Sequence, residues 1–173
     1  MKPIVFRYGI IASIVILLFG CLQLFVIMPR SDYKTAEVTG YLTIVLAMIF
    51  VFFGIKKYRD LNDGVLSFGQ GLKVGLLIAL MPAVFFALFD LLYTEVINPS
   101  WSGDYYQYQL QQLKETTPAD QLATKIEKLE TQKETFGQPH MLFLIMFLTV
   151  FVIGAMVSII SALTLRRGKP AAA

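Results

Sequence analysis

The sequence predicts an all-helical integral membrane protein, folded as an antiparallel bundle of four membrane-spanning helices. Three observations lead to this prediction. Hydrophobic residues make up 56% of the 173 residues, whereas a soluble domain contains about 45–50% apolar residues. The apolar residues also gather in four blocks, each with about the length that crosses a bilayer. Because lipid offers no hydrogen-bond partner to an exposed peptide group, each block must be helical.

The four blocks define the expected spans, and these spans and their connections account for nearly the whole chain. They cover Ile10–Met28, Val38–Ile55, Leu72–Tyr93 and Met141–Leu165. We therefore expect a single membrane domain over residues 1–173, without room for a separate catalytic domain.

The connections between the spans carry turn signals. Pro29–Glu37 is short and polar, so the first two spans should form an antiparallel hairpin. In the second connection, Asn62-Asp63-Gly64 predicts a turn, because these residue types tolerate positive φ. Pro82 should kink or break the third span, since proline lacks an N–H and clashes with the preceding turn.

The long connection before the fourth span, about residues 98–137, should itself be helical. Asp104 is expected to cap a short helix that contains Tyr106 and Leu113. A second helix should begin with Thr117 as its N-cap and Pro118 at its first position. Its apolar stripe consists of Leu122, Ile126, Leu129, Lys133 and Phe136. We expect the two helices to form a hairpin; a membrane-surface helix and an interface with a partner protein are the alternatives.

Positive charge predicts the orientation of the chain. Nine of the 15 Lys and Arg residues lie in the N-terminal stub, the second connection and the C-terminal tail, which four spans place on one side. Short positively charged loops stay in the cytoplasm, so both termini should be cytoplasmic and the 98–137 segment extracytoplasmic. Trp101, Tyr105, Tyr106 and Tyr108 fit an aromatic belt at the outer interface.

The composition excludes several functional classes. One histidine and one cysteine rule out a multi-His/Cys metal site. No phosphate-binding loop, HExxH helix or GxSxG elbow occurs, so we expect no enzymatic activity, cofactor or metal. The net charge of +3 comes from cations at the ends of the spans, which fits membrane orientation and argues against a nucleic-acid partner.

Asp90 is the strongest single candidate for a functional site. A carboxylate at membrane depth is energetically costly and commonly marks a proton or ion pathway. Asp90 lies 18 residues after Leu72, or ~27 Å along a helix, which places it near the outer boundary. Two interpretations stay open: an intramembrane proton or ion site, and a structural residue that faces the interface.

Two further groups of polar residues lie at opposite ends of the spans. Glu95 and His140 belong to a candidate outer titrating cluster; alternatively, His140 only begins the fourth span at the headgroup level. Lys56, Lys57 and Arg59 close the second span. They serve either as orientation anchors or as contacts to anionic lipid head groups.

Small residues form two stripes that predict close helix packing. Gly71 and Gly75 make a GxxxG pattern at the start of the third span, and Gly154, Ser158 and Ala162 repeat every fourth residue in the last span. Such faces let helices approach closely in lipid. We expect packing within the chain, with self-association of two copies as the alternative.

Four stretches of the sequence resemble a known family. They are Gly40–Leu42, Phe53–Asp60, Ser67–Leu76, and Ser158–Leu163 followed by Arg166-Arg167. Together they are similar to domain-of-unknown-function family 4199 (DUF4199), small four-span membrane proteins of Bacteroidetes-type bacteria. The resemblance covers nearly the whole chain and implies a bacterial inner-membrane setting. It implies no activity and no site residues, because the family has no established ones.

These observations favour a non-enzymatic accessory, scaffold or structural component of the bacterial inner membrane. Its expected partners are membrane lipids and either a second copy or another membrane protein. One alternative is a small oligomeric transporter or proton-coupled channel that uses Asp90, with Pro82 as a hinge. A weaker alternative is an envelope or pH sensor that uses His140 and Glu95.

Overall fold

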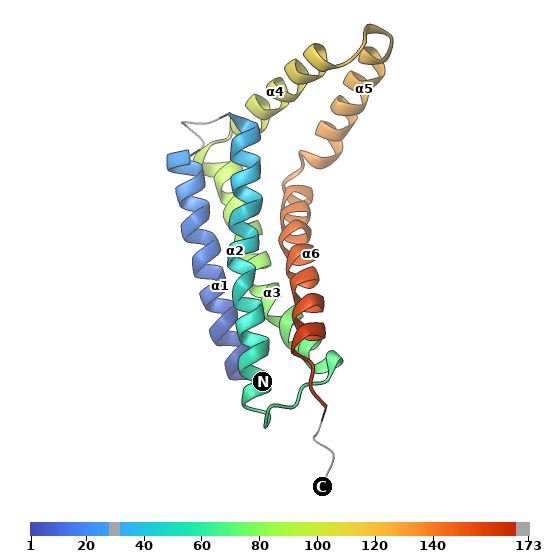
Figure 1. The fold of residues 1–173 in the computed structure, drawn as a ribbon. Coiled ribbons are helices and arrows are strands. Elements are labelled where there is room, and N and C mark those ends of the chain that lie inside the picture. The colour runs from blue at the N-terminus through green and yellow to red at the C-terminus, as the bar shows by residue number, and fades with distance from the viewer. Residues whose placement is uncertain (28–31, 169–173) are drawn as a thin grey trace. The chain divides into compact units, whose positions relative to one another are not determined.

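The computed structural model describes residues 1–27 and 32–168, and every element named in them is helical. In chain order the elements are α1 (Lys2–Leu22), the π-helical turn η1 (Gln23–Ile27), α2 (Tyr33–Asp60), α3 (Phe68–Leu92), the π-helical turn η3 (Tyr93–Ile97), α4 (Trp101–Thr116), α5 (Ala119–Phe136) and α6 (Pro139–Leu165) (Figure 1). Four stretches are long and apolar enough to cross a membrane: Lys2–Ile27, Tyr33–Asp60, Phe68–Ile97 and Pro139–Leu165. The prediction of an all-helical membrane protein with four such helices is confirmed.

The chain divides into two compact units. The first unit consists of the described parts of residues 1–86 and 147–173, and the second unit is Ala87–Met146. The first therefore holds α1, α2, most of α3 and most of α6, whereas the second holds η3 and the α4 and α5 helices.

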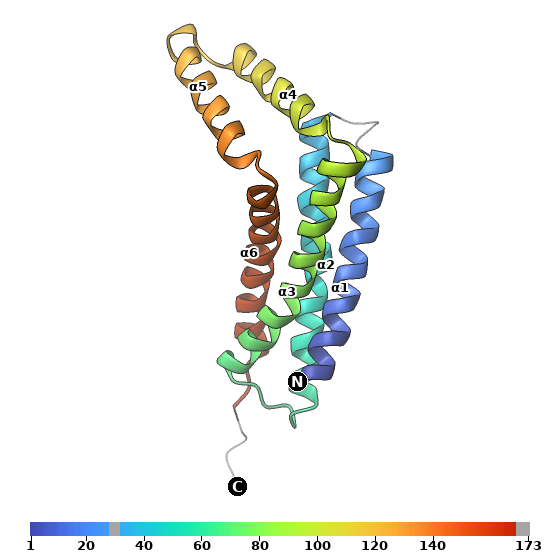
Figure 2. The ribbon, with the colours of Figure 1, turned by 180° about the vertical axis from the view of Figure 1, so that it is seen from behind.

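Within the first unit, α1 and α2 lie side by side and run in opposite directions (Figures 1 and 2). The ring of Tyr8, early in α1, lies against Gly54, late in α2. At the other end, the Gln23 side chain donates a hydrogen bond to the carbonyl of Ala36 at 2.7 Å and accepts one from the Thr39 hydroxyl at 2.9 Å. These polar contacts fix the register of the two helices where the chain turns.

The small residues form a seam between α3 and α6, defined here by Gly71, Gly75 and Ala79 facing Ala162, Ser158 and Gly154. A methyl group added to Gly71 would lie 3.0 Å from Cβ of Ala162, and one added to Gly154 would lie 2.5 Å from Cβ of Ala79. Each step of four residues along α3 matches a step of four in the opposite direction along α6. The two helices are therefore antiparallel and in close contact in this unit.

α3 packs against both α2 and α6 in the first unit. Ile55 of α2 approaches Gly75 from the side of α2, and Met48 of α2 reaches Gly154. The core around this junction is apolar, with Met48, Val51, Ile78 and Val150 all fully buried. Since α2 and α6 are each antiparallel to α3, their C-terminal ends lie at the same end of the first unit.

The surface of the four long helices is as apolar as their interior. Ile14, Leu18, Leu42 and Met156 are between 50% and 65% exposed. Soluble monomers rarely expose contiguous apolar surface of this kind. Lipid contact accounts for it, because an aliphatic side chain loses nothing by facing acyl chains.

Each of the four long helices begins before the apolar block that predicted it, because capping groups as well as hydropathy set where a helix starts. Asp32 caps α2 by accepting a hydrogen bond from the Thr35 N–H at 2.6 Å, and this bond lowers the pKa of Asp32 below its usual value. At the start of α3, the Ser67 N–H donates to Gln70 Oε1 at 3.1 Å and the Gln70 N–H donates to Ser67 Oγ at 3.3 Å, a reciprocal capping box. The expected end of the first span at Met28 lies outside the described residues.

The turn prediction in the second connection is confirmed. Of the two outcomes expected at Pro82, a kink or a break, the break does not occur, and the kink stays a prediction. Asp63 and Gly64 adopt positive φ angles of 52° and 74°. α3 continues through Pro82 without interruption. Pro82 is fully buried, so packing on the surrounding side chains holds the helix where one backbone hydrogen bond is missing.

In the second unit, α4 and α5 pack as a hairpin. Lys133 Nζ lies 4.2 Å from the centre of the Tyr106 ring, and Leu129 is the buried residue of α5. The expected caps are wrong: α4 begins at Trp101, before Asp104, and Pro118 rather than Thr117 is the N-cap of α5. Thr117 cannot start α5 because it ends α4, where its N–H donates to the Leu113 carbonyl at 3.0 Å.

Replacing Gly75 with Ala should lower the free energy of unfolding by about 1–3 kcal/mol. The added methyl group would lie 2.7 Å from Cβ of Ser158 and 2.9 Å from Cδ1 of Ile55. The matched control is Gly40→Ala in α2, where no atom of the described residues lies within 4 Å; it should be neutral or stabilise by up to about 1 kcal/mol. Unfolding in mild detergent, followed by circular dichroism, measures both, and equal effects would contradict the seam.

Candidate functional site

The C-terminal end of α2 carries the three cations that the sequence grouped together, and the structure separates them. Lys56 and Lys57 are exposed and have no ion pair within the described residues. Arg59 is instead paired with Asp60, whose Oδ1 accepts from Nη2 at 2.8 Å and from Nε at 3.0 Å. The two lysines are therefore the cations at this end of α2 that are available to an anion.

The tail after α6 adds two more cations at the same end of the first unit. Arg167 and Leu66 exchange both backbone hydrogen bonds, each 2.9 Å long, as an isolated β-bridge. This bridge ties the tail to the connection between α2 and α3 and leaves the side chains of Arg166 and Arg167 exposed. The sequence carries no signal for such a bridge, because it joins single residues that are far apart in the chain.

The small residues proposed for helix packing are used inside the first unit. Gly71, Gly75, Gly154, Ser158 and Ala162 are all buried, and they face one another across the seam. A second copy would therefore have to bind through other residues.

Asp90 lies half-buried in the part of α3 that belongs to the second unit. It lies 22 residues after the start of α3 at Phe68, or ~33 Å along the helix axis. The hydrocarbon core of a membrane is about 30 Å thick, which is slightly less than this distance. If the helix runs close to the membrane normal, Phe68 and Asp90 cannot both lie within the core, and at least one of them lies at its boundary. The Thr94 hydroxyl donates to the backbone carbonyl of Asp90 at 3.0 Å.

The structure places Glu95 and His140 on exposed positions of the second unit, in η3 and in the first turn of α6. No hydrogen bond or ion pair joins them to each other or to Asp90 in the described residues, so the titrating cluster stays a prediction. The described ranges also contain no group of three or more His, Cys, Asp or Glu side chains that could hold a metal ion.

Three aromatic rings at the start of α4 form a continuous stack. The rings of Trp101 and Tyr105 are parallel within 6° and 5.2 Å apart, and that of Tyr108 follows at 6.3 Å from Tyr105. The spacing of four and three residues could have predicted this stack, because such residues share one helical face. The Trp101 indole N–H is shielded from solvent and has no hydrogen-bond partner among the described residues.

One known protein family matches nearly the whole chain. The sequence profile described as "Protein of unknown function (DUF4199)" matches residues 7–167. The chain belongs to this family. The match covers every candidate residue of this DUF4199 protein, including Lys56, Asp90 and His140. No curated protein and no solved structure matches the chain.

Trp101 is the only tryptophan of this DUF4199 protein, which makes it a direct probe of depth. Because aromatic side chains gather at the headgroup level, lipids brominated near the headgroup should quench its fluorescence more strongly than lipids brominated near the end of the acyl chain. The measurement is steady-state fluorescence of the reconstituted protein, with Trp101→Phe as the blank. Strongest quenching by the deepest label would contradict an interfacial position.

Proposed function

We propose that this DUF4199 protein is a non-enzymatic accessory, scaffold or structural component of the bacterial inner membrane. The observation that carries the proposal is the apolar interior of the first unit. Its buried polar residues among those described are Ser13, Ser158 and Ser161, and none is charged. Ser13 and Ser158 donate their hydroxyl protons to carbonyls of their own helices at 2.8 and 2.7 Å. Side chains used in this way do not support substrate binding or proton transfer.

An accessory role places function on the surfaces of the molecule. The apolar faces of the four long helices are suited to lipids and to other membrane proteins, whereas α4 and α5 offer mostly exposed polar side chains. We propose a membrane protein or a second copy as the partner, and no nucleic acid.

The proposed orientation has both termini in the cytoplasm. It is supported by the cations that follow α2 and α6 at one end of the first unit, since short loops rich in Lys and Arg stay on the cytoplasmic side. α4 and α5 follow an odd number of spans, so they would be extracytoplasmic.

Site-specific photo-crosslinking in native membranes tests the accessory role. A crosslinking residue is placed at Glu130 on the exposed side of α5, at Ile14 on the apolar surface of α1, and at buried Leu129 as the control. We expect one discrete protein adduct, in a reproducible ratio to the chain, from Glu130 or Ile14 and none from Leu129. Adducts to lipid alone at both exposed positions would contradict a scaffold.

Asp90 favours a second candidate, a small oligomeric transporter or proton-coupled channel. It is a half-buried carboxylate within the apolar stretch Phe68–Ile97, and such residues often belong to ion pathways. Proton or cation flux into vesicles that contain the purified protein should then be abolished by Asp90→Asn. The exposed neighbour Glu95→Gln is the control and should keep its flux. Flux at the level of protein-free vesicles for the unaltered chain would end this candidate.

A further inference from the structure

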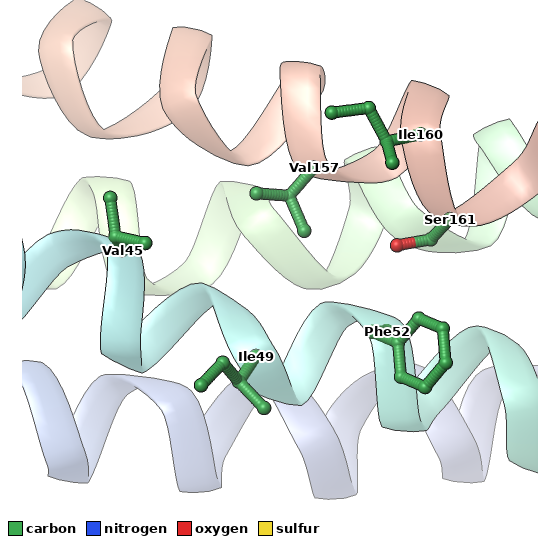
Figure 3. Close-up of a pocket in the computed structure, with 6 residues that line it drawn as sticks. All are labelled: Val45, Ile49, Phe52, Val157, Ile160 and Ser161. Atoms are coloured by element: carbon green, nitrogen blue, oxygen red, sulfur yellow. The ribbon is translucent and has the colours of Figure 1, made fainter.

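An open apolar groove runs between α2 and α6 in the first unit (Figure 3). Its volume is about 330 Å³, within the range of ~300–1,000 Å³ that ligand pockets have. The lining residues are Val45, Ile49 and Phe52 of α2 and Val157, Ile160 and Ser161 of α6. Phe52 and Ser161 lie at one end of the groove and Val45 at the other, with α3 behind them (Figure 3).

The α2 wall of the groove leads directly to a cation. Val45, Ile49, Phe52 and Lys56 are four, three and four residues apart, so they share one face of the helix. Lys56 therefore lies one turn, or ~6 Å along the axis, beyond the end of the groove that Phe52 marks. Its side chain is exposed, and the described residues offer it no acidic partner.

The α6 wall ends beside further cations. α2 and α6 have their C-terminal ends at the same end of the first unit, and Arg166 and Arg167 follow α6 directly. The backbone bridge between Arg167 and Leu66 fixes where the tail begins. Thus the apolar groove points toward the end of the unit where Lys56, Arg166 and Arg167 gather.

We propose that this groove holds one acyl chain of an anionic phospholipid, with the lipid phosphate on Lys56 and on the arginines that follow α6. The groove opens on the side of two membrane-crossing helices and has cations beyond one end. It therefore complements such a lipid, which has an apolar chain and an anionic headgroup at one end of it. A second copy of the chain fits less well. Packed in parallel on this groove, it would bring its own Lys56, Lys57 and Arg166 to the same end and add like charges.

Native mass spectrometry of the full chain, released from micelles that contain dioleoylphosphatidylglycerol or dioleoylphosphatidylcholine, tests the site. Each Lys or Arg near an anionic lipid contributes enough affinity for about a fivefold change in binding. We therefore expect the anionic lipid to be retained at least fivefold better than the zwitterionic one.

Two pairs of variants separate this site from general charge attraction. Lys56→Gln should weaken retention of the anionic lipid about fivefold. Lys57→Gln, turned by about 100° around the helix, should have little effect. Ile49→Trp fills the groove and should abolish retention, whereas Leu46→Trp, equally apolar and exposed but outside the lining, should not. Thermal unfolding of each variant in detergent verifies that it is folded.

Several results would overturn the proposal. Equal retention of the two lipids would contradict selectivity for an anionic headgroup. Equal effects of Lys56→Gln and Lys57→Gln would contradict a defined position for the lipid phosphate at Lys56. Equal effects of Ile49→Trp and Leu46→Trp on lipid retention by folded protein would show that the groove is not the site of the acyl chain. A dimer in the spectra that Ile49→Trp abolishes would assign the groove to a second copy instead.

Discussion

The need to satisfy polar groups where lipid offers them no partner governs the long helices of the first unit. Lipid offers the backbone no hydrogen-bond partner, and the same limit applies to hydroxyl groups. Ser13, Thr43, Ser158 and Thr164 all donate to the carbonyl four residues earlier in the chain. Among the described residues these four side chains make no hydrogen bond to a neighbouring helix, so apart from the Gln23 contacts with α2 the helices are held together by close packing.

Close packing in turn requires small residues at specific positions. Between α3 and α6, Gly75 faces Ser158 and Ala79 faces Gly154, so the two backbones approach without intervening side chains. Large aliphatic side chains such as Leu18 and Met156 are left for the outer surface. Large side chains such as Met48 and Ile78 also fill the core beside the seam, so the first unit differs from a water-soluble protein in its apolar outer surface and not in a core of small residues.

The sequence predicted the parts of the fold that depend on hydropathy and local turn chemistry. Four apolar blocks and the Asn62-Asp63-Gly64 turn needed no knowledge of distant residues. Helix ends were harder, because they depend on which residue a capping group is free to serve. Thr117 shows this, since its role at the end of α4 prevents it from starting α5.

For the candidate sites, the sequence predicted which residues share a face of one helix, but not which residues of another helix they contact. Both small-residue stripes were visible in the sequence, but GxxxG patterns do not specify their partner, so only the structure joins Gly75 to Ser158. The arginine of the KKYRD run illustrates a second limit: its charge is paired with Asp60, which spacing alone does not decide. The groove was not predictable at all, because its walls come from residues 45–52 and 157–161.

The seam and the groove lie on two different faces of α6. Gly154, Ser158 and Ala162 face α3, while Val157, Ile160 and Ser161 line the groove toward α2. A change in the seam should therefore alter the free energy of unfolding and, through the position of α6, the width of the groove. A change at Lys56, which is exposed and outside the seam, should alter the binding of lipid alone. If a bound lipid fills the groove, it also stabilises α6 against α2, because a ligand that binds only the folded state raises its stability. The lipid composition of the membrane would then set the stability of the contact between α2 and α6, and with it the surfaces that a partner protein can bind. Such regulation requires no polar path through the interior of the protein.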